Sequence, residues 1–357
     1  MEVLNTIFVL PFLDMADSPI FFAEVVVSGL LTGVLYSLVA LGFVLIFKAS
    51  GVFNFAQGAM VLFAALTLVG LMKAGLPLWA ALALGLGGAY SLIKNLQQGS
   101  RNGVLLSGAV IALAIVGSFP GLPIWMALII TAGLMVVLAV AIEKLVLRPL
   151  VNQPDIILFM ATIGITFILE GFGETVWGSD IHRLDVGIPD VPIDVAGMLL
   201  STFDMWAAAI GAAMVAGLAL FFRYTVIGRA LRAVADDHQA ALSVGIPLKT
   251  IWIVVWSVAG IVGLVAGIMW GTKSGVQFSL SLIALKALPV LILGGFTSIP
   301  GAIVGGLIIG VGEKVAEIYW GPLVGGAIEN WFAYMLALVF LLFRPQGLFG
   351  EKIIERV

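Results

Sequence analysis

The 357 residues of the chain are 62% apolar by the set AVILMFWYC and only 10% charged. Soluble globular domains are about 25% charged, so this chain has too few charged side chains to cover a water-soluble particle of its size. The absence of cysteine excludes a disulfide framework, a thiolate metal site and a cysteine nucleophile. Two histidines, a net charge of −3 and the lack of a basic block give no support to a metal cluster or to nucleic-acid binding. The composition predicts an integral membrane protein.

The apolar runs are long and continuous rather than alternating with a period of two, which favours helices over a β-barrel. A helix needs about 20 apolar residues to cross a hydrocarbon core of roughly 30 Å. We therefore predict an all-α, polytopic bundle with nine to eleven spans. The predicted segments are 21–47, 58–72, 76–93, 104–119, 123–142, 155–171, 205–222, 250–270, 283–297, 300–316 and 328–343.

Charge predicts the orientation of these helices. Residues 1–20 contain acidic side chains but neither Lys nor Arg, so we expect an external N-terminal segment without a cleavable signal peptide. Residues 21–357 are expected to form a single transmembrane domain. If the C-terminus is cytoplasmic, most of the 17 basic residues fall in inner loops. The segment 172–204 is then an acidic outer loop.

An internal similarity suggests an added helical pair. Residues 75–82 and 121–128 share the pattern Gly-Leu-Pro-x-Trp-x-Ala-Leu, and each copy opens a predicted helix. Duplication and chance similarity between apolar segments both remain open. The segment 76–119, which has the length of one repeat unit, is expected to be an extra helical pair.

The inner loop 223–249 has its own helix signals. Asp236 and Gln239 form a capping-box pattern, and Gly245 followed by Pro247 predicts a helix stop. We expect a short helix over 237–244 outside the bilayer, on which Ala240 and Ala241 leave room for a partner to approach. The alternative is an ordinary solvated connector.

This loop also resembles a known motif. Residues 239–245, Gln-Ala-Ala-Leu-Ser-Val-Gly, are similar to the EAA loop of ABC importer permeases, with Gln where that pattern has Glu. Further segments resemble the branched-chain amino acid (LIV-type) permease family, in which His is usual where Gln57 stands. These segments are 33–42, 51–58, Glu143 with Arg148 and Pro149, 232–236, 294–302 and 344–350.

The resemblance implies a type II-like ABC importer permease in a bacterial inner membrane. Its implied partners are a second related permease chain, two cytoplasmic ATP-binding subunits and an external solute-binding protein. The implied ATPase-coupling residues are Arg232, Asp236, Asp237, Gln239, Ala240, Ala241 and Gly245. In this chain Lys249-Thr250 and Lys273-Ser274 are the only Lys-Ser/Thr pairs, and neither follows Gly as a P-loop requires. We therefore expect no enzyme activity and no cofactor, with ATP bound by the partners.

Pathway residues are sought where spans are short or interrupted by glycine. Two segments qualify, Asn54–Gly58 and Gly294–Gly301, although glycine also permits tight helix packing and a structural turn would also explain Asn54 and Gln57. Lys286 is the most deeply placed charge and either pairs with an acid or lines the path. Glu24, Glu170 and Glu313 are expected at the membrane interface. The pathway candidates are Asn54, Gln57, Gly294, Gly295 and Lys286.

The sequence thus predicts an importer permease for branched-chain amino acids or related small polar solutes. Within the same class, a permease for urea or short-chain amides is the alternative. From another class, an ATP-independent secondary transporter or channel would require a buried carboxylate cluster, and the sequence presents no strong one.

Overall fold

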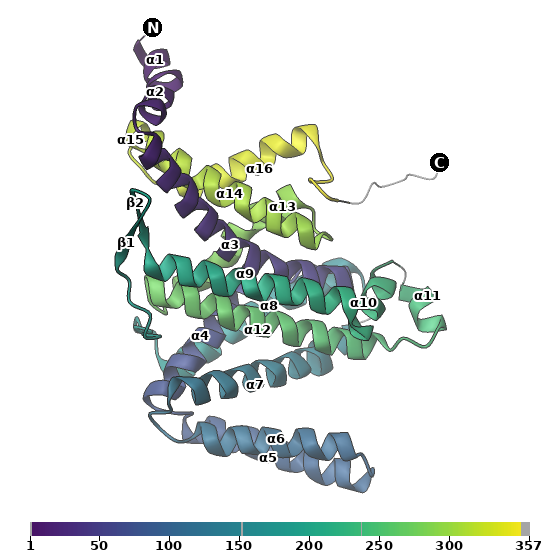
Figure 1. Ribbon diagram of the computed structural model, residues 1–357. Coiled ribbons are helices and arrows are strands. Elements are labelled where there is room, and N and C mark those ends of the chain that lie inside the picture. The colour runs from purple at the N-terminus through teal and green to yellow at the C-terminus, as the bar shows by residue number, and fades with distance from the viewer. Residues whose placement is uncertain (1, 151–152, 237, 351–357) are drawn as a thin grey trace. The chain divides into compact units, whose positions relative to one another are not determined.

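The computed structural model describes residues 2–150, 153–236 and 238–350, and the regular secondary structure of these residues is helical apart from one two-stranded hairpin (Figure 1). The chain divides into two compact units. Unit 1 comprises Met1–Gly51, Gly187–Ile246 and Leu282–Val357. Unit 2 comprises Val52–Val186 and Pro247–Ser281.

Every predicted span coincides with a helix, but fewer of them are long enough to cross a membrane than predicted. By length and composition, six helices of the described chain qualify, or up to seven if the bent pair α4 and α5 is one span. The predicted nine to eleven spans also counted helices of 12 to 17 residues, which are shorter than the roughly 20 residues of a full crossing. The six are Pro19–Ser50, Ile124–Leu150, Asp155–Trp177, Thr202–Tyr224, Leu248–Ser274 and Ile299–Tyr319.

Unit 1 is built on the pair α3 (Pro19–Ser50) and α14 (Ile299–Tyr319), with α9 (Thr202–Tyr224) and α13 (Ile283–Gly294) packed on α3. Glycines at the crossing allow the two backbones to touch: a Cβ at Gly33 would lie 2.7 Å from the carbonyl oxygen of Gly306. Lipid offers no hydrophobic drive for helix association, so such close packing holds the pair together. The remaining helices of this unit are α1 (Glu2–Phe8), α2 (Leu10–Asp17), α10 (Val226–Asp236), α11 (His238–Ser243), α15 (Gly321–Val324), η4 (Ile328–Asn330) and α16 (Phe332–Phe343).

The predicted outer loop contains structure that the sequence did not indicate. Strands β1 (Pro192–Val195) and β2 (Met198–Ser201) form an antiparallel hairpin. The two turn residues, Ala196 and Gly197, both have positive φ, as the two-residue turns that suit strand twist require. The hairpin leads directly into α9.

Unit 2 is centred on α12 (Leu248–Ser274), which packs against α4 (Gln57–Lys73) and α7 (Ile124–Ile142), while α4 also packs on α8 (Asp155–Trp177). The predicted helical pair exists as a hairpin of α5 (Leu78–Gln97) and α6 (Arg101–Gly117). Its helices are joined by Asn95, whose Nδ2 donates to Ser91 and Ser107. The shorter elements of unit 2 are η1 (Glu143–Leu147), η2 (Arg148–Leu150) and η3 (Phe278–Leu282), whose last residue is assigned to unit 1.

Candidate functional sites

The predicted coupling segment lies in unit 1, where α10 is attached to the end of α9. The Arg232 guanidinium donates to the carbonyl oxygens of Phe222, at 2.5 Å, and Arg223, at 3.3 Å. These carbonyls belong to the last turn of α9, where helix ends leave acceptors unpaired and favour cations. Gly228 lies directly against the backbone of Phe222. Arg232 therefore fixes the start of the segment.

The predicted short helix is confirmed as α11, and its predicted stop at Gly245 is confirmed as well. Gly245 has a φ of 84°. Its N–H donates to Leu242 and the N–H of Ile246 donates to Ala241, both at 3.0 Å, which is a Schellman ending. Asp237 and the side chain of Gln239 lie outside the described part of the chain, and Asp236 is the last residue of α10.

The surface of α11 differs from the expectation. Ala241 is buried at 2% exposure, so only Ala240 of the small pair faces outward. Two larger apolar side chains, Leu242 and Val244, are exposed beside it. The exposed side chains described in this segment are therefore apolar apart from Ser243, a feature that the sequence motif did not single out.

Asn54 and Gln57 are both buried within unit 2, and their side-chain amides form hydrogen bonds inside it. Asn54 Oδ1 accepts the Ala56 N–H at 3.1 Å, and its Nδ2 lies 3.4 Å from Gln57 Oε1. Gln57 Nε2 donates to the Ala259 carbonyl of α12 at 3.2 Å. Their exposures of 1% and 0% and these bonds support the structural turn.

Gly294 and Gly295 form the turn between α13 and α14 in unit 1, and the C-terminal motif binds this turn. The N–H groups of Leu348 and Phe349 donate to the carbonyl oxygens of Leu293 and Gly294 at 2.8 and 3.1 Å. Gly295 adopts a φ of 101°, which only glycine tolerates readily. Two motifs that are distant in sequence, 294–302 and 344–350, are thus brought together.

Lys286, on α13, has an acidic partner. Its Nζ lies 3.6 Å from Glu329 Oε1, and Lys314 Nζ lies 4.0 Å from the other oxygen of Glu329. The side chains are 27%, 34% and 39% exposed for Lys286, Lys314 and Glu329, so this group of charges is partly accessible. Lys286 therefore pairs with an acid, as predicted, and its side chain is accessible as well.

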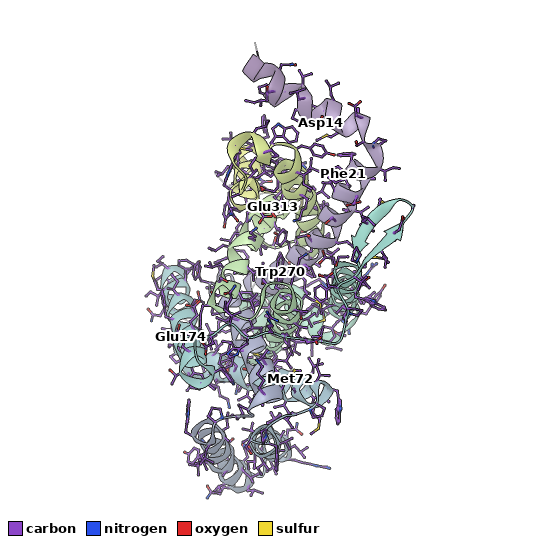
Figure 2. The ribbon with its side chains drawn as sticks, turned by 90° about the vertical axis from the view of Figure 1, so that its left-hand side faces the viewer. Asp14, Phe21, Met72, Glu174, Trp270 and Glu313 are labelled. Carbon is purple, nitrogen blue, oxygen red and sulfur yellow. The ribbon has the colours of Figure 1, made fainter. Side chains whose placement is uncertain are left out.

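Glu313, labelled in Figure 2, is buried inside unit 1. It is 3% exposed, and the Tyr36 hydroxyl on α3 donates to its Oε2 at 2.7 Å. Its Oε1 is buried with no hydrogen-bond partner among the described residues. The sequence placed Glu313 near a helix end, but it lies opposite α3 in the tightest helix pair. The sequence contained one indication of this contact: Tyr36 places a hydroxyl group in an otherwise apolar span, where it needs a hydrogen-bond partner.

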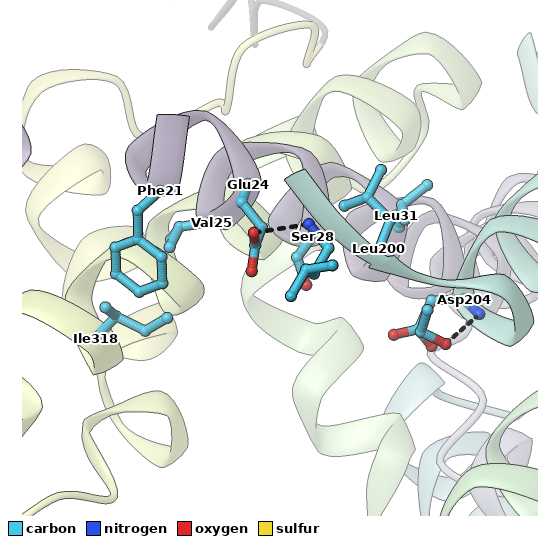
Figure 3. Close-up of a pocket in the computed structure, with 10 residues that line it drawn as sticks. Phe21, Glu24, Val25, Ser28, Leu31, Leu200, Asp204 and Ile318 are labelled. Atoms are coloured by element: carbon cyan, nitrogen blue, oxygen red, sulfur yellow. Dashed lines mark hydrogen bonds between the residues drawn. The ribbon is translucent and has the colours of Figure 1, made fainter. Parts of the chain in front are cut away.

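A second acidic feature of unit 1 is a cavity of about 200 Å³ between α3, the start of α9 and the end of α14 (Figure 3). Glu24 and Asp204 line it, and Glu24 Oε2 accepts the N–H of Leu199 at 2.8 Å. Glu24 is half-buried, as is Glu170 on α8. Glu24 therefore ties α3 to β2.

Long apolar helices with charged side chains paired inside them define a polytopic membrane protein. The match to a family model makes the class specific: residues 25–92 and 99–344 match the model described as "Branched-chain amino acid transport system / permease component". The chain belongs to this family. It is a permease component, which is a transport subunit without a catalytic domain, and in this family ATP is bound by separate ATPase subunits.

Individual relatives agree with the family over nearly the whole chain. LivH of Salmonella typhimurium, a high-affinity branched-chain amino acid transport system permease protein, is 24% identical over 356 residues, covering 96% of this chain and 100% of LivH. LivH of Escherichia coli K12 is 25% identical with the same coverage of both chains. A probable branched-chain amino acid permease of Methanocaldococcus jannaschii is 28% identical over 75% of this chain and 87% of its own.

Proposed function

We propose that this permease imports branched-chain amino acids as part of a complex with a second related permease chain, two cytoplasmic ATPases and an external solute-binding protein. The functions by which the full-length relatives are named support the substrate class. The distribution of Lys and Arg supports an outer N-terminus and a cytoplasmic C-terminus in a bacterial inner membrane. We further propose that 21–357 acts as one transport domain, with 76–119 as an added helical pair.

The coupling role belongs to the segment from α10 to Gly245. One observation carries this proposal: α11 is a separate six-residue helix with a Schellman ending, and Ala240, Leu242 and Val244 are exposed on and directly after it. A short helix with a closed C-terminal ending moves as a rigid body, and its exposed apolar side chains suit a groove on another protein. ATP-driven movement of the ATPases would then reach α9 through Arg232 and α10.

Substitution of Ala240 by Arg tests this docking. The added volume and charge should clash with a groove that fits a methyl group, so we expect about tenfold weaker association with the ATPase, or about 1.4 kcal/mol. The measurement is co-purification of the ATPase with the full-length permease from detergent-solubilised membranes. The matched control is Ala196→Arg in the β1–β2 turn, another exposed alanine. Equal ATPase recovery with A240R and A196R would rule out docking through this face.

For the pathway, we propose that solute passes near Lys286 of the charged group in unit 1. Its partial exposure and its ion pair with Glu329 support a polar lining in an otherwise apolar region. We propose that four other candidates act as turn residues that set the shape of this permease rather than as solute contacts. They are Asn54, Gln57, Gly294 and Gly295.

Lys286→Met should lower uptake of labelled leucine about tenfold, because an interaction worth about 1.4 kcal/mol is lost at the passage. The assay uses vesicles that contain the permease with its ATPases and binding protein. Lys94→Met, at an exposed position on α5, is expected to leave uptake unchanged. Competition by excess leucine but not urea separates this substrate class from the amide alternative, and unchanged uptake with K286M would remove Lys286 from the pathway.

A further inference from the structure

Two neighbouring cavities in unit 2 share a wall. The first has a volume of about 330 Å³ and is lined almost entirely by apolar side chains of α4, α5, α7 and α8. Its α7 wall consists of Leu134, Val137, Leu138 and Ala141, whose spacing places them on one face over two helical turns. Trp79 of α5 and Phe172 of α8, both more than 40% exposed, make an edge-to-face contact beside it. The crevice is therefore elongated and apolar.

The second cavity, of about 390 Å³, lies at the end of α4 and the turn that follows it. Lys73 and His182 are among its lining residues, and it shares Val176 and Trp177 with the apolar crevice. His182 Nε2 lies 3.2 Å from the Trp177 carbonyl oxygen and so holds the end of α8. Among the described residues that line the two cavities there is no carboxylate, which leaves Lys73 as the cation of the site.

Trp177 lines both cavities. Its indole Nε1 is buried without a hydrogen-bond partner in the described part of the chain. The ring is wedged against Gly70, where a Cβ would overlap it, and it packs edge-to-face on Phe63 at 5.4 Å. The ring edge that carries Nε1 faces Gly70 and is closed off from both cavities, so Trp177 acts as the wall between them.

We propose that this double cavity binds one anionic phospholipid of the surrounding bilayer. An acyl chain lies in the apolar crevice, and the phosphate pairs with Lys73. The acyl chain thus meets an apolar lining, and the negative charge of the lipid meets a cation. A free amino acid fits poorly, since the lining offers its ammonium group no carboxylate.

Photo-crosslinking tests the proposal. The full-length chain is reconstituted in phosphatidylcholine vesicles that contain a trace of phosphatidylglycerol, or of phosphatidylcholine, with a diazirine in its acyl chain. We expect phosphatidylglycerol to label peptides that contain 79–84 or 134–141 about fivefold more than phosphatidylcholine does, since one lysine near a lipid phosphate accounts for such a factor. Lys73→Gln should abolish this preference, and Ala83→Phe should reduce labelling with either lipid by filling the crevice.

The matched control is Lys94→Gln at the far end of α5, which lines neither cavity; it should keep the fivefold preference. Lys73→Arg, which retains the positive charge, should keep the preference for phosphatidylglycerol and provides a second test of the charge pairing. Equal labelling of 79–84 and 134–141 by the two lipids in the wild-type chain, or a preference that survives K73Q, would overturn the proposal.

Discussion

Replacement of Gly306 by Leu is expected to prevent unit 1 from folding. A Cβ at this position would lie 2.7 Å from the carbonyl oxygen of Gly33 and 2.8 Å from the backbone nitrogen of Ser37. Backbone cannot rotate away as a side chain can, so α3 and α14 would have to separate. Overpacking commonly costs about 1–3 kcal/mol, and at this backbone contact we expect about 3 kcal/mol or more. The measurement is the yield of monodisperse protein in detergent, followed by thermal unfolding.

Gly217→Leu is the matched control for this substitution. Gly217 also belongs to a long helix of unit 1, α9, but a Cβ there would meet no atom within 4 Å. The same change in size and hydrophobicity should therefore leave both yield and unfolding temperature close to those of the natural chain. Comparable losses from the two leucines would show that glycine is required for a reason other than the α3–α14 contact.

Substitution of Glu313 by Leu should destabilise unit 1 by about 1–3 kcal/mol, because the buried Tyr36 hydroxyl would lose its acceptor. Glu313→Gln should cost far less, since its carbonyl oxygen can still accept from Tyr36. Denaturant unfolding in micelles measures both variants. The difference between Leu and Gln separates the hydrogen bond from the volume of the side chain.

A double-mutant cycle with Tyr36→Phe tests whether the two residues act as a pair. If the bond carries the effect, E313L and Y36F together should cost clearly less than the sum of the two single losses. Additive losses would mean that Glu313 stabilises α14 by some other contact. Unchanged stability of E313L would contradict the importance of this buried carboxylate altogether.

The positions of the helices could be predicted from the sequence because a helix in lipid requires a long apolar run, which is visible in the sequence. The number of crossings could not, since segments of similar hydropathy differ in where their helices end. The helix stop at Gly245 could also be predicted, because a left-handed glycine followed by proline has a local cause. The turn at Ala196 was missed because a non-glycine residue at positive φ carries no strong local signal.

The candidate sites also include features that the sequence shows and features that only the fold reveals. Lys286 was recognised as a charge within an apolar segment, but its partner Glu329 is distant in sequence and only the fold reveals it. The burial of Glu313 was not predicted, because the number of residues to a helix end says nothing about which neighbour covers a side chain. The crevice beside Trp177 depends on four helices at once, and no single stretch of sequence contains it.

The pairing of α3 with α14 has a consequence for biosynthesis. Everything from Gly51 to Ser298 must be translated after α3 and before its partner helix, which at about 5–20 residues per second takes on the order of tens of seconds. During that interval the glycine-lined groove of α3, with the hydroxyl of Tyr36, stays in the bilayer without the surface it fits. Nascent chains of this permease should therefore depend on an insertase or a lipid-embedded chaperone that shields α3 until the last long helix emerges.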